Sequence, residues 1–162
     1  MRAFGGKLSI AVVLASGLGL AAAHAAETTT QPRPLFRHPD VETAWTAVHE
    51  TGRPLFIFVT RKDCPYCEKM LAETLAHRKL TPALRQQFET VQFTAEERPD
   101  LIKHFAIRLC PTVLVVSAEG EFLARIEGFT DPKKFVATVR PALAKYAASQ
   151  QAVAERPIRQ VR

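Results

Sequence analysis

The sequence of 162 residues is poor in three residue types, with only three cysteines, two methionines and one tryptophan. After residue 25 it has no apolar run of the roughly 20 residues that a membrane span requires. No basic run is interleaved with aromatic residues, so nothing indicates a nucleic-acid partner although the net charge is +6. It also contains no internal repeat. With 47% hydrophobic and 23% charged residues, what remains fits one globular domain with appended segments.

The first 25 residues have the pattern of a secretory signal peptide. Arg2 and Lys7 give a positive start, an apolar and small-residue run follows over residues 8–20, and an A-x-A cleavage pattern ends at Ala25. An uncleaved membrane anchor is the alternative, but the run is short for a span and no basic residues stop it. We therefore expect residues 1–25 to be removed, the protein to be periplasmic, and no stable membrane insertion after cleavage.

The rest of the chain divides where its composition changes. Residues 26–39 are polar and contain three prolines, so they predict an extended linker. Residues 40–146 alternate apolar segments with amphipathic ones and predict the folded domain. Residues 147–162 lose that periodicity and predict a flexible tail.

Within residues 40–146 the pattern predicts five helices and four strands. The helices are expected over residues 41–50, 64–77, 81–88, 99–105 and 132–146, and the strands over residues 53–60, 90–95, 111–117 and 121–127. Strands that alternate with helices and end in a hairpin indicate an α/β fold. We expect a central mixed β-sheet flanked by helices, with a closing β-hairpin and a C-terminal helix.

Two of the three cysteines stand in the motif CPYC, residues 64–67, between an apolar strand and a helix. At a helix N-terminus Cys64 faces unpaired N–H groups and the positive end of the helix dipole, and both lower the pKa of a thiol. Arg61 and Lys62 add positive charge nearby. Cys67 lies about one turn further on, within reach of Cys64 to release it from a mixed disulfide. The motif predicts a redox pair in which Cys64 is the nucleophile and Cys67 the resolving residue.

Two structural uses of the same pair fit less well. A structural zinc site takes four ligands, and no second Cys/His pair stands at a short spacing, so we expect no bound zinc. A structural disulfide between Cys64 and Cys67 would close a loop too short to constrain the unfolded chain much. No cofactor is expected.

The stretch FAIRLCPTVLVVSAEGEFLARIEGFTDPKKFVATV, residues 105–139, resembles the C-terminal half of thioredoxins. In that family a short helix leads to a Pro-Thr pair, then a hairpin, a glycine and the last helix. Together with the CPYC motif, the resemblance covers residues 40–146. It implies a thioredoxin fold, a Cys64–Cys67 disulfide in the oxidised form and protein-disulfide oxidoreductase activity. Pro-Tyr between the cysteines is itself similar to glutaredoxins.

The resemblance also implies a groove for the substrate beside the redox pair. In the family the proline at Pro111 is cis, and the backbone next to it pairs with an extended segment of the substrate. A trans proline that merely begins a strand is the alternative. The groove residues that the resemblance implies are Pro65, Tyr66, Cys110, Pro111, Thr112 and Gly128.

Two residues depart from the thioredoxin pattern. Thioredoxins have a buried aspartate six positions before the first cysteine, which helps to move protons at the second, and here that position is Phe58. Cys110 stands where the family has Thr, Val or Ile. We expect it to face Cys64 if Pro111 is cis, and to affect redox behaviour without being essential. Equally, it fits the role of a small apolar residue.

These features predict an exported thiol–disulfide oxidoreductase that acts on proteins with disulfides. We expect a reductant rather than an oxidant, because the motif lacks the Pro-His of the strongest periplasmic oxidant. A Dsb-type membrane thiol reductase is the expected electron donor. The alternative is a metal-binding module that holds copper(I) through Cys64, Cys67 and Cys110, since soft thiolates favour that ion.

Overall fold

The computed structural model describes residues 34–155, and in this part of the chain four strands form one mixed sheet. The strands are β1 (Leu55–Thr60), β2 (Glu89–Thr94), β3 (Thr112–Val116) and β4 (Phe122–Glu127). Their order across the sheet is β2-β1-β3-β4. β1 pairs in parallel with β2 and antiparallel with β3, and β3 pairs antiparallel with β4. The predicted mixed sheet with a closing hairpin is thus confirmed.

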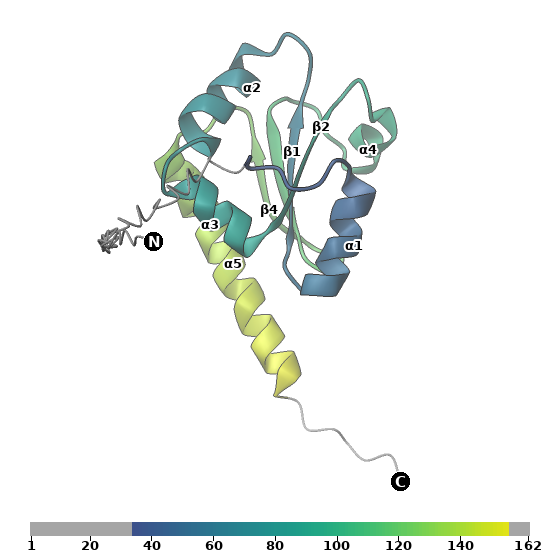
Figure 1. Cartoon of the computed structure of the whole chain (residues 1–162), viewed down its shortest axis with the longest axis vertical. Coiled ribbons are helices and arrows are strands. Elements are labelled where there is room, and N and C mark those ends of the chain that lie inside the picture. Colours follow the sequence, from purple (N-terminus) through teal and green to yellow (C-terminus); the bar gives the residue numbers. More distant parts are fainter. Residues whose placement is uncertain (1–33, 156–162) are drawn as a thin grey trace, which may run out of the picture. The chain divides into compact units, whose positions relative to one another are not determined.

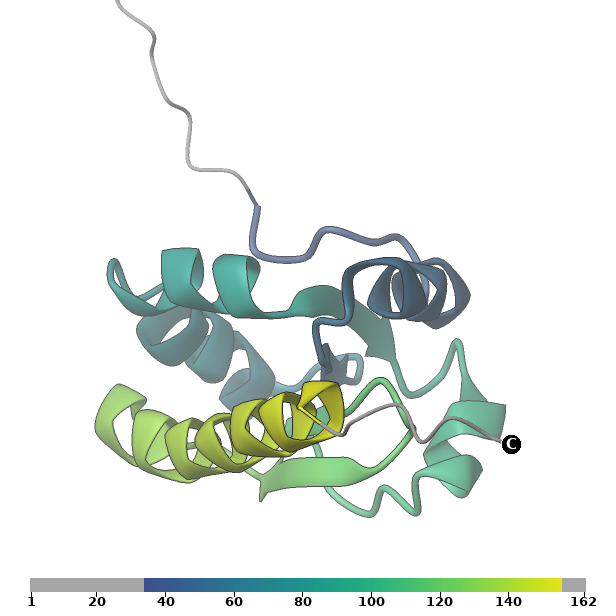
Figure 2. The same cartoon turned by 90° about the horizontal axis from the view of Figure 1, so that it is seen from below.

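Helices cover both faces of this sheet (Figures 1 and 2). They are α1 (Val41–Thr51), α2 (Pro65–Lys69), the π-helical η1 (Met70–Leu75), α3 (Leu80–Gln87), α4 (Pro99–His104) and α5 (Pro132–Ala154). α1 packs on β1 and β2, whereas α5 packs on β4 and on η1. This arrangement confirms the α/β class.

Strand β1 lies at the centre of the molecule and is buried along its whole length. Phe56 and Phe58 point into the core beneath α2, η1, α3 and α5. Leu55, Ile57 and Val59 point into a second core, formed with α1 and α4. Because successive side chains of a strand face opposite sides, a strand covered on both faces has an unbroken apolar sequence.

The ends of the long helices follow the capping residues that the sequence indicates. Asp40 accepts a hydrogen bond from the Thr43 amide at 2.7 Å and begins α1. Gly52 ends α1 in the left-handed conformation, with φ of 69°. Asp131 accepts hydrogen bonds from the amides of Lys133 and Lys134 at the start of α5.

The last part of the expected linker over residues 26–39 contacts the sheet. The amides of Arg37 and His38 both donate to the carbonyl of Thr90, and His38 forms a parallel bridge with Val91. Phe36 packs against the core, with its ring stacked on Phe58 at 6.0 Å between centroids. The prolines make this segment resemble a linker in the sequence. In the structure it is extended and is held by contacts with residues distant in the chain. Residues 1–33, including the expected signal peptide, lie outside the described residues.

Within the tail expected from residue 147, α5 continues to Ala154. Alanine and glutamine dominate residues 147–154, and both favour helix. The buried Tyr146 fixes the helix before this extension, since its hydroxyl donates to the Gly52 carbonyl at 3.2 Å. Residues 156–162 lie outside the described part. Within residues 34–155 no helix combines the length and apolar character needed to cross a membrane.

The helix expected over residues 64–77 is continuous but changes type. After α2 it widens into η1, where the Ala76 amide donates to the carbonyl of Leu71, five residues back. Met70, Thr74 and Leu75 of η1 are buried. The Thr74 hydroxyl donates to the Thr130 carbonyl at 2.6 Å, which ties this helix to the start of α5.

Candidate active site

The site begins where β1 ends and the chain turns into α2. Asp63 in this turn has a φ of 50°, a left-handed conformation that Asp tolerates better than most residues. Cys64 follows as the N-cap of α2 in extended conformation, and Pro65 occupies the first turn. The Cys67 amide donates to the Cys64 Sγ at 3.2 Å. The first cysteine therefore receives an N–H of the first helical turn, as the sequence predicts.

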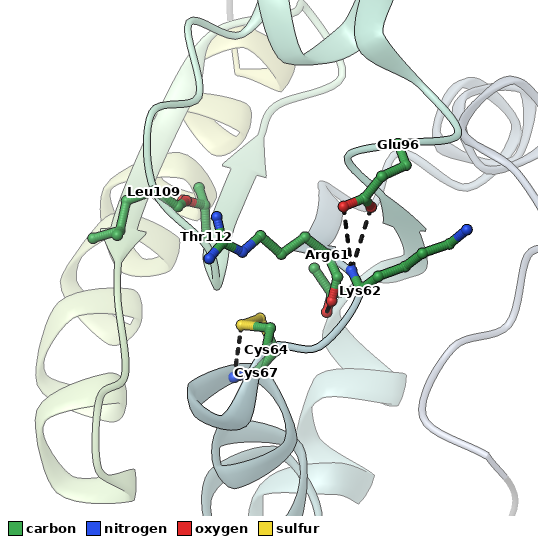
Figure 3. Close-up of a disulfide and its surroundings, with 8 residues drawn as sticks. Arg61, Lys62, Cys64, Cys67, Glu96, Leu109 and Thr112 are labelled. Atoms are coloured by element: carbon green, nitrogen blue, oxygen red, sulfur yellow. Dashed lines mark hydrogen bonds between the residues drawn. A yellow bond between two sulfur atoms is a disulfide. The ribbon is translucent and has the colours of Figure 1, made fainter.

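Cys64 and Cys67 form a disulfide, with 5.2 Å between their Cα atoms. The two cysteines differ in burial, because Cys64 is 6% exposed and Cys67 only 1%. Figure 3 shows the disulfide at the end of the helix, facing the loop that precedes β3. Cys64 is therefore the less buried cysteine of the pair.

The loop before β3 forms the other wall of the site. The peptide bond between Cys110 and Pro111 is cis. The Thr112 hydroxyl donates to the Leu109 carbonyl at 2.5 Å, and the Gly128 amide donates to the Pro111 carbonyl at 2.8 Å. These two bonds hold the loop at the start of β3 and against the end of β4.

Gly128 and Leu109 are packed together beside this loop. A Cβ built on Gly128 would lie 3.5 Å from Leu109 Cδ2, and the φ of Gly128 is 78°, which disfavours any other residue. Leu109 itself is 51% exposed, and Tyr66 on α2 is 64% exposed. Sequence reasoning missed Leu109, although an apolar residue next to the Cys-Pro pair was the signal that could have found it.

Cys110 is a free, half-buried cysteine. It packs against the core cluster that contains both Cys64 and Cys67. Burial raises the pKa of its thiol above the ordinary value; the positive charge of Arg61 lowers it, and the carboxylate of Glu96 raises it. Cys110 is therefore a neutral thiol at pH 7.

The core under the redox pair is apolar. Phe58, at the position of the thioredoxin aspartate, is fully buried and stacks with Phe36. Cys67 and Met70 belong to the same cluster. Phe36 lies outside the boundaries expected for the domain, so sequence reasoning did not connect it with the site.

The structure also bears on the metal alternative. Among residues 34–155, no group of three or more His, Cys, Asp or Glu side chains is arranged to hold a metal ion. In the same structure Cys64 and Cys67 are bonded to each other. The copper(I) site that would use both of them with Cys110 finds no support.

Comparison with known proteins gives a family and a fold. Residues 41–142 match the sequence model of a family described as a thioredoxin-like domain. No curated protein matches the chain.

Several solved structures are similar to this chain. A thioredoxin from Thermus thermophilus has a TM-score of 0.64 at 20% identity, over 76% of this chain and 98% of that one. A DsbH oxidoreductase has a TM-score of 0.57 at 21% identity, over 73% and 94%. The reduced C-terminal domain of DsbD from Neisseria meningitidis has a TM-score of 0.52 at 23% identity, over 66% and 91%. At these identities the likeness shows the fold alone.

Proposed function

This chain belongs to the thioredoxin-like family, whose fold and Cys-x-x-Cys disulfide support thiol–disulfide oxidoreductase activity, and we propose that it is an exported reductant of protein disulfides. Cys64 is the nucleophile in this proposal and Cys67 the resolving residue. Its substrates are proteins that carry disulfides, and a Dsb-type membrane thiol reductase supplies its electrons.

The observation that carries the proposal is the unequal setting of the two sulfurs. Cys64 is at the N-terminus of α2, where its sulfur accepts the Cys67 N–H, and it is the less buried of the two cysteines. N–H donors and the helix dipole stabilise a thiolate at that position. Cys67 is buried behind it and can attack only Cys64.

The proposed reaction moves two electrons from the protein to its substrate. In the reduced protein the Cys64 thiolate attacks one sulfur of the substrate disulfide, whose other sulfur leaves as a thiolate. The Cys67 thiolate then attacks Cys64 in the mixed disulfide. The substrate's second sulfur leaves, the Cys64–Cys67 bond forms, and the substrate is left as a dithiol.

Phe58 changes how the proton of Cys67 is handled in this scheme. A buried carboxylate at that position could take the proton, but a phenylalanine ring cannot. Glu68, next to Cys67 in the sequence, is exposed. We propose that water accepts the proton, so that replacing Glu68 with glutamine leaves the rate of disulfide reduction unchanged.

Export and direction rest on sequence features. The signal-like pattern that ends at Ala25 supports export, and a mass of the mature protein that begins at residue 26 would test it. The lack of Pro-His between the cysteines supports a reductant.

The deciding experiment is the reduction potential of the Cys64–Cys67 couple. The purified protein is equilibrated in thiol/disulfide buffers and its free thiols are counted by mass-tag alkylation, with Cys64→Ser as the control. A potential near the roughly −270 mV of thioredoxin supports a reductant, whereas one near roughly −120 mV makes the protein an oxidant. The absence of a reversible couple would overturn the redox function itself.

A further inference from the structure

Arg61 brings a positive charge over the redox pair. It follows the last residue of β1, and Figure 3 shows its side chain crossing above the disulfide towards the segment that carries Leu109 and Thr112. The pKa of the Cys110 thiol responds to it, because the Arg61 charge lowers that pKa against the effect of burial. The guanidinium is therefore at the mouth of the site.

Within residues 34–155 the Arg61 side chain has no hydrogen-bond or ion-pair partner. Arg53, Arg98 and Arg125 are each paired, with Glu89, Glu42 and Glu127. Arg78, Arg108 and Arg140 are unpaired like Arg61 among the described residues, so it is the position of Arg61 above the disulfide that distinguishes it. Glu96, which Figure 3 shows near Arg61, instead accepts hydrogen bonds from the Lys62 amide at 3.3 Å. A guanidinium without partners presents a planar set of donors that matches a carboxylate.

Exposed side chains of α2 and of the loop before β3 limit which partner can bind at the site. Tyr66 and Leu109 are large, apolar and more than half exposed. Lys69 adds a second positive charge, with its Nζ 4.6 Å from the centre of the Phe129 ring. A partner that covers these residues needs apolar side chains, and it gains by placing a carboxylate on Arg61.

We propose that Arg61 is a specificity residue that pairs with a carboxylate close to the reacting cysteine of the substrate protein. The inference rests on the proposed function, since the substrate disulfide must approach Cys64 for Arg61 to meet its neighbours. The pairing holds the substrate sulfur at Cys64 and leaves the exchange reaction itself unchanged. Substrate segments that carry Glu or Asp beside the cysteine are therefore reduced faster than neutral ones.

The test compares two symmetrical disulfide dimers, of the peptides acetyl-Ala-Glu-Cys-Ala-amide and acetyl-Ala-Gln-Cys-Ala-amide. The reduced full-length protein is mixed with each dimer, and its oxidation is followed by acid quench and mass-tag alkylation. Each rate constant is divided by that of dithiothreitol with the same dimer, which removes the intrinsic difference between the peptides. We expect a corrected Glu/Gln ratio of about 3, the size of one exposed charge pair. In Arg61→Gln the ratio falls to about 1.

Lys62→Gln is the matched control, because it removes a neighbouring positive charge whose side chain points away from the disulfide in Figure 3. We expect this variant to keep the wild-type ratio, and 0.5 M salt to lower that ratio in the wild type by screening.

An equal ratio in wild type and Arg61→Gln overturns the inference but not the proposed function. Loss of all reaction in the wild type overturns both. If Arg61→Gln slows glutathione disulfide more than the Glu dimer, the carboxylate belongs to that tripeptide and the protein-segment assignment is wrong.

Discussion

The two ends of the β1–β2 pair differ in where their charged residues lie. The strands are parallel and in register, from Leu55 beside Glu89 at one end to Thr60 beside Thr94 at the other, about 17 Å away. At the first end a carboxylate is buried and surrounded by partners. At the second end, which leads into the redox pair, the buried residues Thr60 and Thr112 carry no charge and the charged Arg61 is exposed.

The buried carboxylate of Glu89 is compensated entirely by residues of the chain itself. Its side chain is 2% exposed and binds His38 Nε2 at 2.6 Å, Arg53 Nη2 and the Thr51 hydroxyl at 3.1 Å. A carboxylate so placed would be costly without these partners. At this end of the sheet the chain itself supplies the partners of the charge, whereas the exposed Arg61 is free to meet a substrate, as we propose.

The largest expected effect is that of Cys64→Ser, which should change disulfide exchange far more than the free energy of unfolding. We expect Cys64→Ser to abolish disulfide exchange, because it removes the proposed nucleophile. It lowers the free energy of unfolding by at most about 2 kcal/mol, because the lost disulfide closes a very short loop. Peptide-disulfide reduction and urea unfolding measure the two quantities. Exchange that persists in Cys64→Ser would contradict the assigned role.

At the opposite end of the strand pair, we expect Glu89→Gln to lower the stability of the fold without changing its redox chemistry. The amide keeps the shape but removes the charge that Arg53 and His38 meet, so the free energy of unfolding falls by about 3 kcal/mol. The reduction potential stays at the wild-type value. Urea unfolding gives the first quantity and thiol/disulfide buffers give the second. Glu42→Gln is the control: its exposed pair with Arg98 is worth less than about 1 kcal/mol. Equal losses in both variants would show that the buried network does not stabilise the fold.

Phe36→Ala tests whether the segment before α1 belongs to the domain. It removes the ring that stacks on Phe58 beneath the redox pair, and we expect a loss of about 2 kcal/mol, less than for a fully buried phenylalanine. Phe122→Ala, at a site where the ring is 56% exposed, should cost less than about 1 kcal/mol in the same urea titration. A Phe36→Ala variant as stable as the wild type would return residues 34–39 to a linker.

Lowering the pH should remove the contribution of Glu89 to the free energy of unfolding. Burial alone raises the pKa of Glu89, but the hydrogen bond with His38 and the charge of Arg53 outweigh it, so the pKa lies below the ordinary 4.5. A lowered folded-state pKa gives stability that is complete above about pH 4.5 and is lost as the pH falls through the folded value. Urea midpoints from pH 7 to pH 3 should therefore converge for wild type and Glu89→Gln. A constant difference would contradict the shift.

Features that depend on neighbouring residues could be predicted from the sequence. The unbroken apolar run of β1, the caps at Asp40 and Asp131 and the position of CPYC before a helix are all features of neighbouring residues. They were enough to place Cys64 at a helix N-terminus at the end of a central strand. The order of strands and helices then predicted the α/β class.

Features that depend on distant partners could not be predicted in the same way. Phe36 follows a proline-containing polar stretch, and its packing on Phe58 depends on how the sheet places the two residues. The partners of Glu89 come from two separate segments of chain, one with His38 and one with Thr51 and Arg53. In each case tertiary contacts supply information that propensity and periodicity lack.

The smallest expected effect concerns Cys110. Its half-buried thiol packs against the cluster that contains Cys64, and its raised pKa keeps it protonated at pH 7. A neutral thiol is a weak hydrogen-bond donor, so it can stabilise a Cys64 thiolate slightly. Cys110→Val has similar size but no donor, and we expect it to shift the reduction potential by about 10–30 mV, up to about tenfold in the exchange equilibrium. Cys110→Ser keeps a donor and should stay nearer the wild type. Wild-type potential and exchange rates in Cys110→Val would make Cys110 a small apolar residue of the wall and nothing more.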